Sequence, residues 1–205
     1  MMSLRNEVEK FKNWASVYSV QKVSGEWEDD YPDWSTFYEA AIIFLVSSSP
    51  AKWVDEDVTD LLYAIARDNE VEYLAQEVAK NNENLLKLSE FAIGSPERDA
   101  KWQLAAQLGG ISSRKQEAEA LLLQFVDDQD EYVSRRALLS LGLLKSSKAE
   151  VLAERAWKTG NEYQRIAALW VLKDVASSKL SAYIAEAVID GRQYLVKNAD
   201  EVKKT

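Results

Sequence analysis

The sequence predicts an all-α fold in which antiparallel helix pairs stack into a solenoid, forming one domain over residues 1–205. Seven Gly and three Pro residues are too few for the tight turns that hairpin-rich β folds need. Helix-favouring Ala, Leu, Glu and Lys dominate the chain instead. Similar segments recur every 31 to 33 residues, and a period near this length is typical of stacked two-helix repeats.

Residues 1–81 are predicted to form N-terminal capping helices, because they show no clear repeat. In a solenoid each repeat packs only against its neighbours, so this part is expected to cover one end of the stack. The expected helices span residues 4–19, 34–47, 55–67 and 70–80. The second of them has an apolar face formed by Trp34, Phe37, Tyr38, Ala41, Ile42 and Leu45.

Residues 82–190 contain the repeats. Three segments align with one another: RDAKWQLAAQLGGI at 98–111, EYVSRRALLSLGLL at 131–144 and EYQRIAALWVLKDV at 162–175. Aligning Gly109 with Gly142 gives a step of 33 residues, and aligning Glu131 with Glu162 gives a step of 31. Other helical patterns precede the three segments, at 82–93, 114–126 and 148–158. The linkers have only a few residues, so consecutive helices are expected to pack antiparallel.

The ends of the predicted helices carry the residues that such ends favour. Asp127, Asp128 and Asp130 precede the second helix of the middle repeat, where carboxylates cap free N–H groups. Pro96 has the same entry position one repeat earlier. After the repeats, helices are expected at 182–190 and 193–202, the latter within a C-terminal helix and tail at 191–205.

One of the aligned segments carries a family signature. The residues Asp130, Val133, Arg135, Ala137, Leu141 and Gly142 resemble the second-helix signature of HEAT repeats. Ser134 stands where that signature usually has Arg. The resemblance implies a right-handed α–α superhelix whose second helices line the concave face. It also implies a scaffold more often than an enzyme, because HEAT-like proteins include few enzymes.

The composition limits the chemistry that the chain can perform. It has no His and no Cys, which excludes imidazole and thiolate metal sites, disulfides, and Cys or Ser-His nucleophiles. We therefore predict no catalytic residue, no metal, no cofactor and no enzymatic activity. The net charge is −9, with −11 in residues 1–100 and +2 in the rest. This acidity makes nucleic acid an unfavourable partner and suits a basic protein.

The same sequence indicates where the protein works. The longest uncharged run, residues 40–51, is shorter than the roughly 20 residues of a membrane span. The N-terminus carries charges in place of an apolar signal core. We therefore expect a bacterial cytoplasmic protein with no membrane partner. The polar last helices favour a monomer or a weak dimer.

The first candidate partner-binding surface is the acidic and aromatic segment GEWEDDYPDW at residues 25–34. Its aromatic rings are suited to anchor a basic partner. The alternative is an ordered loop whose rings cover the capping helices while Asp33 caps the next helix. The predicted contact residues are Glu26, Trp27, Glu28, Asp30 and Tyr31.

The second candidate surface is formed by the polar starts of the second helices. If the repeats stack in register, these side chains form a basic and aromatic ladder that binds an acidic peptide or a phosphate chain. The alternative is that the Arg groups pair with nearby acids such as Asp128 and Glu131. The predicted contact residues are Lys101, Trp102, Gln103, Tyr132, Arg135, Arg136, Tyr163 and Arg165, with Gln164 beside them.

The leading function hypothesis is a non-catalytic protein–protein interaction module, and a specific version of it is an immunity or antagonist protein that blocks a basic effector. The alternative is a HEAT-like DNA-binding enzyme of the alkylpurine glycosylase type. In that alternative the ladder holds damaged DNA, with Trp170 or Asp174 as further contacts, although the net charge argues against it. A third hypothesis is a structural subunit that stacks on a second copy through the ends of the solenoid.

Overall fold

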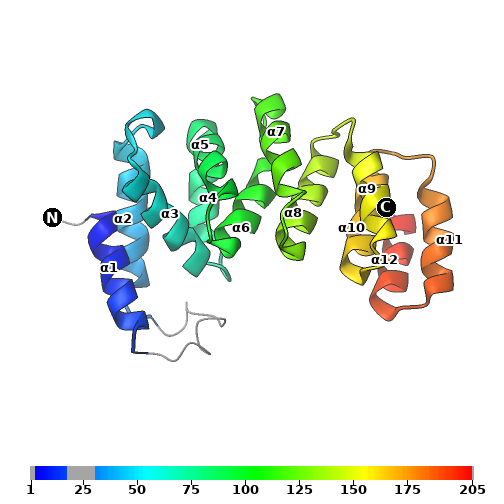
Figure 1. Cartoon of the computed structure of the whole chain (residues 1–205), viewed down its shortest axis with the longest axis horizontal. Helices are drawn as coiled ribbons and strands as arrows, with labels where there is room; N and C mark the ends of the chain where they lie inside the picture. Colours follow the sequence, from blue (N-terminus) through cyan, green and yellow to red (C-terminus); the bar gives the residue numbers. More distant parts are fainter. Residues whose placement is uncertain (1–2, 18–30, 205) are drawn as a thin grey trace. The chain divides into compact units, whose positions relative to one another are not determined.

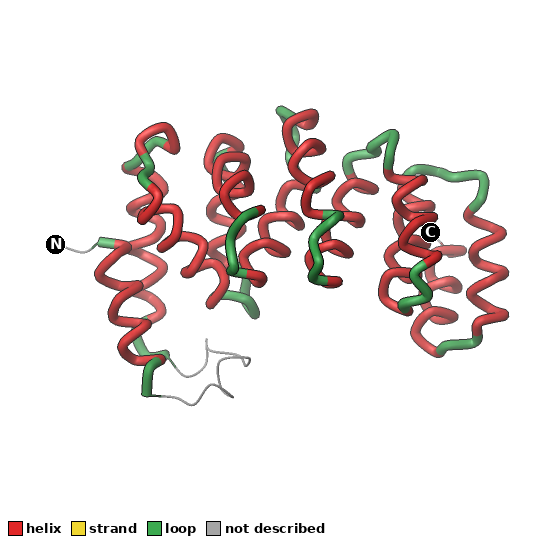
Figure 2. The backbone as a smooth tube through the Cα atoms, viewed as in Figure 1, coloured by secondary structure: helices red, strands yellow, loops and turns green. Residues whose placement is uncertain are grey.

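The structure is a computed structural model that describes residues 3–17 and 31–204. All regular elements in this part of the chain are helices, joined by short loops (Figures 1 and 2). The prediction of an all-α solenoid of helix pairs is confirmed, and the handedness of the superhelix stays a prediction. The chain divides into two compact units, residues 1–107 and 108–205, and the boundary falls within a helix. The predicted single domain, with repeats beginning at residue 82, stays a prediction.

Unit 1 comprises residues 1–107. Helix α1 packs on α2 and α3, and α3 also packs on α4 and α5. The elements are α1 (Leu4–Ala15), α2 (Trp34–Ser47), the short 3-10 helix η2 (Pro50–Lys52), α3 (Asp55–Arg67), α4 (Tyr73–Ala79), α5 (Asn82–Ile93) and most of α6 (Arg98–Leu108). Helix α1 ends at Ala15, and the predicted continuation to residue 19 includes residues outside the described part.

An aromatic cluster forms the core where α1, α2 and α3 meet. At its centre is Phe11, which is completely buried. The rings of Trp14, Tyr31, Trp34, Phe37 and Tyr63 lie around it, with centroid distances between 4.7 and 6.1 Å. Offset and edge-on ring pairs at such distances add to the free energy gained from burial alone. The capping part of the chain thus has a core of its own.

Helix α4 begins three residues later than the sequence predicts. Buried Asp68 ends the chain's run through α3 and holds the next turn, because its Oδ2 accepts a hydrogen bond from the backbone N–H of Leu74 at 2.6 Å. The hydroxyl of Tyr38 donates to the other carboxylate oxygen at 2.8 Å. Glu72, just before the helix, has a φ of 58°, in the left-handed region. This turn leaves residues 70–72 outside the helix.

Unit 2 comprises residues 108–205 and consists of three helix pairs. In each pair the two helices pack together, and α8, α10 and α12 also lie side by side as one layer. The helices are α7 (Lys115–Phe125), α8 (Glu131–Leu143), α9 (Ala149–Lys158), α10 (Glu162–Asp174), α11 (Leu180–Asp190) and α12 (Gln193–Lys204). Asp130 caps α8 as predicted, and Asn161 caps α10 in the same way one repeat later.

Two glycines mark equivalent close approaches between second helices. A Cβ added at Gly109 would lie 2.7 Å from the Oγ of Ser140 on α8. A Cβ added at Gly142 would lie 3.1 Å from Cγ2 of Val171 on α10. The two glycines that align in the sequence therefore occupy the same kind of position, where the next helix leaves no room for a side chain.

The ends of α8 and α10 also repeat, and this signal is missing from the sequence analysis above. Lys145 and Ala176 have φ values of 59° and 53°, and each follows its helix in a Schellman arrangement. The next residues, Ser146 and Ser177, each accept a backbone hydrogen bond two residues further on at 3.1 Å. The sequence carries Ser-Ser-Lys at both places, 146–148 and 177–179, at the same step of 31 residues.

Candidate functional site

The strongest candidate site lies in unit 2, where α8 and α10 are neighbours. The guanidinium of Arg135 lies over the ring of Tyr132, 4.7 Å from its centroid, and over the ring of Tyr163, 5.1 Å away. Tyr132 and Arg135 share a face of α8 because they are three residues apart, and Tyr163 is one repeat further on. We call these three residues the Tyr–Arg–Tyr cluster. The structure thus brings together part of the predicted ladder.

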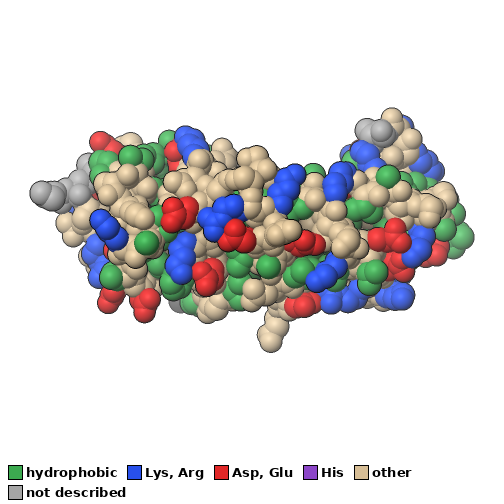
Figure 3. Space-filling model, turned by 90° about the horizontal axis from the view of Figure 1, so that it is seen from above, with side chains coloured by type: hydrophobic (Ala, Val, Ile, Leu, Met, Phe, Trp, Pro, Cys, Tyr) green, Lys and Arg blue, Asp and Glu red, His purple; other side chains and the backbone are tan. Residues whose placement is uncertain are grey.

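The charge of the cluster is largely balanced inside the fold. Nε of Arg135 donates to a carboxylate oxygen of Glu131 at 3.0 Å, and the Arg135 side chain is only 20% exposed. Tyr163, in contrast, is 52% exposed. The cluster therefore presents an amphipathic aromatic ring, held by a cation–π contact, and not the basic groove that the sequence predicted. Figure 3 shows acidic and basic side chains interspersed over the face seen there.

Arg165 does not join the Tyr–Arg–Tyr cluster, because it leaves α10 on another side. Residues two apart on a helix point roughly 200° away from each other, which separates Arg165 from Tyr163. The guanidinium lies 5.0 Å from the ring centroid of Trp157, and its Nε donates to the Trp157 carbonyl at 3.1 Å. It also pairs with Asp190 at the end of α11. Arg165 thus ties three helices together, as the alternative hypothesis expects.

Asp190 has a second cation beside it. Arg192 donates from Nε and Nη2 to the two carboxylate oxygens of Asp190, at 2.6 and 2.8 Å. These hydrogen bonds, with the positive charges of Arg192 and Arg165, lower the pKa of Asp190 to about 2. The carboxylate is therefore charged at neutral pH and serves as the shared anchor of two Arg side chains.

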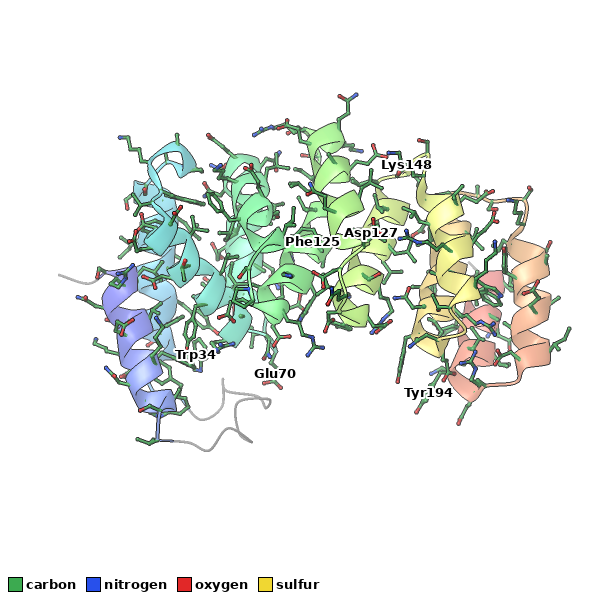
Figure 4. The ribbon with its side chains drawn as sticks, in the orientation of Figure 1. Trp34, Glu70, Phe125, Asp127, Lys148 and Tyr194 are labelled. Carbon is green, nitrogen blue, oxygen red and sulfur yellow. The ribbon has the colours of Figure 1, made fainter. Side chains whose placement is uncertain are left out.

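A small polar cavity lies at the repeat in which Ser replaces the family's usual Arg. Ser134 donates from Oγ to the carbonyl of Val126 at 2.8 Å, as Arg165 donates to the equivalent carbonyl 31 residues later. The shorter side chain leaves a cavity of about 270 Å³. Arg155 borders it, and its guanidinium forms an ion pair with Asp127 at 2.8 Å (Asp127 is labelled in Figure 4). The departure at Ser134 was the sequence signal for this cavity.

The ladder residues from α6 lie in unit 1 and are mostly buried. Gln103 is completely buried, and its Nε2 donates to the carbonyl of Ile65 at 2.7 Å. Trp102 is 6% exposed, and its Nε1 donates to Asp99 at 3.0 Å. These two side chains therefore pack inside the fold, which corrects their assignment as partner contacts. Lys101 is half-buried.

Two further positions of unit 2 complete the predicted ladder. Arg136 is half-buried on α8. Gln164 is buried, and its Nε2 donates to the carbonyl of Glu131 at 3.3 Å, so that it links α10 to the start of α8. The exposed part of the ladder is consequently centred on Tyr163.

The acidic and aromatic segment yields one correction. Tyr31 is 5% exposed among the rings around Phe11, and this burial raises the pKa of its hydroxyl to about 12. It is a core residue and not a surface anchor. Asp33 precedes α2, but its side chain forms no capping hydrogen bond, contrary to the expected cap. The other predicted contacts of this segment, Glu26, Trp27, Glu28 and Asp30, lie outside the described residues.

The comparison with protein families agrees with this repeat geometry. Residues 85–173, from within α5 to within α10, match the family model of HEAT repeats. The chain is a HEAT-repeat protein. No curated protein and no solved structure gives a match. HEAT repeats generally serve as scaffolds for protein interaction, and they are typically non-catalytic.

Two further observations concern the described part of this HEAT-repeat protein. Over residues 3–17 and 31–204, no group of three or more His, Cys, Asp or Glu residues is arranged to hold a metal ion. Within the same ranges, no helix is long and apolar enough to cross a membrane.

Proposed function

We propose that this protein is a non-catalytic protein-binding module that holds its partner on the second helices of its HEAT repeats, with the Tyr–Arg–Tyr cluster at the centre of the interface. The observation that carries the proposal is the ring of Tyr163, which is 52% exposed and yet fixed by the guanidinium of Arg135. Tyr and Arg are the residue types most enriched at the energetic centres of protein interfaces.

Preorganisation makes this arrangement favourable for binding. A partner that covers Tyr163 does not have to order it first, because Arg135 lies between this ring and Tyr132. The ion pair between Arg135 and Glu131 keeps the local charge balanced. Recognition through aromatic area and hydrogen bonds therefore fits the site better than recognition through a strong positive field.

The surroundings of the other ladder residues favour a protein partner over DNA. Trp102 is buried, and Arg165 is paired with Asp190. Trp170 donates from Nε1 to Asn198 at 2.8 Å. A glycosylase-like groove needs such groups to face its substrate with a surplus of positive charge. The same balance supports a non-catalytic role, because these groups hold one another.

The identity of the partner class rests on charge. Residues 1–107 contain 10 basic and 20 acidic side chains, a net charge of −10, whereas residues 108–205 have a net charge of +1. An antagonist that blocks a basic effector is the specific version that this asymmetry favours, since opposite charge accelerates association.

The test compares Tyr163→Ala with a matched control. Tyr194 on α12 is 59% exposed and is labelled in Figure 4, so Tyr194→Ala removes a similar ring elsewhere in unit 2. Each tagged variant is used to capture partners from a lysate of the source cells, and the captured proteins are quantified by mass spectrometry. We expect a partner that the unaltered chain and Tyr194→Ala retain and that Tyr163→Ala loses at least about tenfold.

Equal capture by both variants would overturn the proposed site. Duplex DNA at low salt provides the second arm of the test. Binding of DNA that Arg135→Ala abolishes would replace the protein-binding proposal with the nucleic-acid alternative.

A further inference from the structure

A groove on unit 1 is the most prominent apolar surface feature outside the candidate site. It has a volume of about 530 Å³ and lies between α2 and the chain that enters α4. Four α2 residues, Tyr38, Glu39, Ile42 and Ile43, form one side, and Val71 and Tyr73 form the other. The sequence analysis did not single it out, because it assigned the apolar residues of α2 to the core.

The outer face of α2 is unusually apolar for an exposed surface. Glu39 is the one charged residue among the fourteen of this helix. Ile43 is 48% exposed, Val71 is 55% exposed, and Val46, one turn beyond Ile43, is 84% exposed. A helix that is apolar on all sides is normally covered on all sides, whereas the described contacts of α2 with α1 and α4 cover only part of it. The exposed face therefore has the character of an interface.

The groove is formed before any ligand arrives. Tyr38 is held by its hydrogen bond to buried Asp68, whose second oxygen fixes the start of α4. The Tyr38 ring also stacks on Trp34 at 5.2 Å and meets the edge of Tyr73 at 5.0 Å. These contacts fix both walls relative to each other within unit 1. A ligand consequently loses little free energy to ordering the groove.

The shape and the charge of the groove together select the kind of ligand. Its walls are helical side chains with their backbone groups bonded inside the helices, so the groove offers no free strand edge to an extended peptide. The ridges of a helix, in contrast, fit the grooves of another helix. Glu39 is exposed beside the apolar residues, and unit 1 has a net charge of −10. A helix with an apolar face and basic flanks is complementary to this surface.

We propose that the α2–α4 groove is a docking site for a basic amphipathic helix of a partner protein. Apolar side chains of that helix cover Ile42, Ile43 and Val71, and a Lys or Arg beside them pairs with Glu39. A second copy of the chain is a poorer occupant. A two-fold contact between α2 faces would bring Glu39 towards Glu39. The proposal is independent of the proposed function, because the Tyr–Arg–Tyr cluster belongs to unit 2.

The test uses the full chain and two synthetic helical peptides of about 18 residues with the same amphipathic pattern, one of Leu and Lys and one of Leu and Glu. Fluorescence anisotropy measures the binding of each labelled peptide. We expect the Leu/Lys peptide to bind and the Leu/Glu peptide not to bind. Ile43→Asp should weaken binding of the Leu/Lys peptide at least about tenfold, and Glu39→Gln should weaken it less and reduce its salt dependence.

Val188→Asp is the matched control, because Val188 on α11 is 51% exposed, nearly the same fraction as Ile43. It should leave the affinity for the Leu/Lys peptide unchanged, and Ile43→Leu should restore binding. Melting curves check that Ile43→Asp folds, and Val71→Asp provides a second disruption from the opposite wall.

Three results would overturn the proposal. Equal affinity for both peptides would show that charge does not select the ligand. Unchanged binding of the Leu/Lys peptide by both Ile43→Asp and Val71→Asp would place its site elsewhere. Concentration-dependent dimerisation that Ile43→Asp abolishes, measured by sedimentation, would assign the groove to a second copy. Tyr163→Ala leaves peptide binding unaltered if the two surfaces are independent, so failure here is distinguishable from failure of the proposed function.

Discussion

The two units of this protein are stabilised in different ways. Unit 1 has a single concentrated core, the cluster of rings around Phe11. Unit 2 has no such centre among its described residues, and it repeats the same small devices instead. Asp130 and Asn161 cap successive second helices, and Ser146 and Ser177 follow the ends of the same helices. A repeat thus distributes its stability evenly, whereas a capping unit needs one specialised core.

The largest expected effect comes from removing the centre of the unit 1 core. Phe11→Ala should lower the free energy of unfolding of unit 1 by about 3 to 5 kcal/mol, the usual cost of deleting a buried aromatic ring. Five of the seven Trp residues lie in unit 1, so chemical unfolding followed by Trp fluorescence reports mainly on this unit. Phe91→Ala is the control, because Phe91 is 37% exposed. A loss below about 1 kcal/mol for Phe11→Ala would show that the rings do not act as one core.

The next effect tests whether the repeats of unit 2 depend on close helix contacts. Gly109→Ala should destabilise the protein by about 1 to 3 kcal/mol, because the new Cβ meets Ser140 at 2.7 Å. Gly142→Ala should cost less, since its closest neighbour is a side-chain methyl of Val171 at 3.1 Å. Gly94→Ala in unit 1 is the control, with no atom within 4 Å. Urea unfolding monitored by circular dichroism should rank the three in this order, and equal costs would contradict the proposed contact geometry.

The smallest expected effects distinguish the units by pH. The pKa of Asp190 in unit 2 is lowered to about 2 by Arg192 and Arg165, so its contribution to stability is present above the ordinary carboxylate pKa and is lost as the pH falls towards 2. Asp190→Asn should therefore destabilise the protein at pH 7, and its difference from the unaltered chain should shrink below about pH 4.

Unit 1 is expected to respond at the opposite end of the pH scale. Burial raises the pKa of Tyr31 to about 12, so the folded state favours the neutral hydroxyl. This contribution to stability is complete below the ordinary Tyr pKa near 10 and is lost as the pH rises towards 12. Urea unfolding of the chain and of Tyr31→Phe, measured at several alkaline pH values, should converge on acidification and diverge above about pH 10. Parallel curves would contradict the burial of this hydroxyl.

Most of the helices were predictable, because apolar spacing and capping residues act over a few positions. Asp130 shows this well, since its place before Tyr132 and Val133 identified it as a cap. The start of α4 was misplaced because Asp68 receives a hydrogen bond from Tyr38, thirty residues earlier in the chain. A local pattern contains no information about such a partner.

The candidate site was predictable only in part. Gln103 and Trp102 have polar atoms and stand next to Lys101, which suggested a solvent-facing group. Both side chains are buried because Ile65 and Asp99 accept their hydrogen bonds inside the fold. Burial of a polar side chain depends on whether a partner is present, and the helical pattern does not specify that partner.

The sequence by itself determined the all-α class, the repeat step of about 31 residues and the family, because these follow from short-range spacing that recurs along the chain. Only the tertiary structure decided which side of each helix a given Arg or Tyr serves. Arg135 supports an exposed ring, whereas Arg165 is bound by Asp190, and the difference depends on residues one repeat away. The α2–α4 groove likewise exists only because Asp68 fixes Tyr38 against the start of α4.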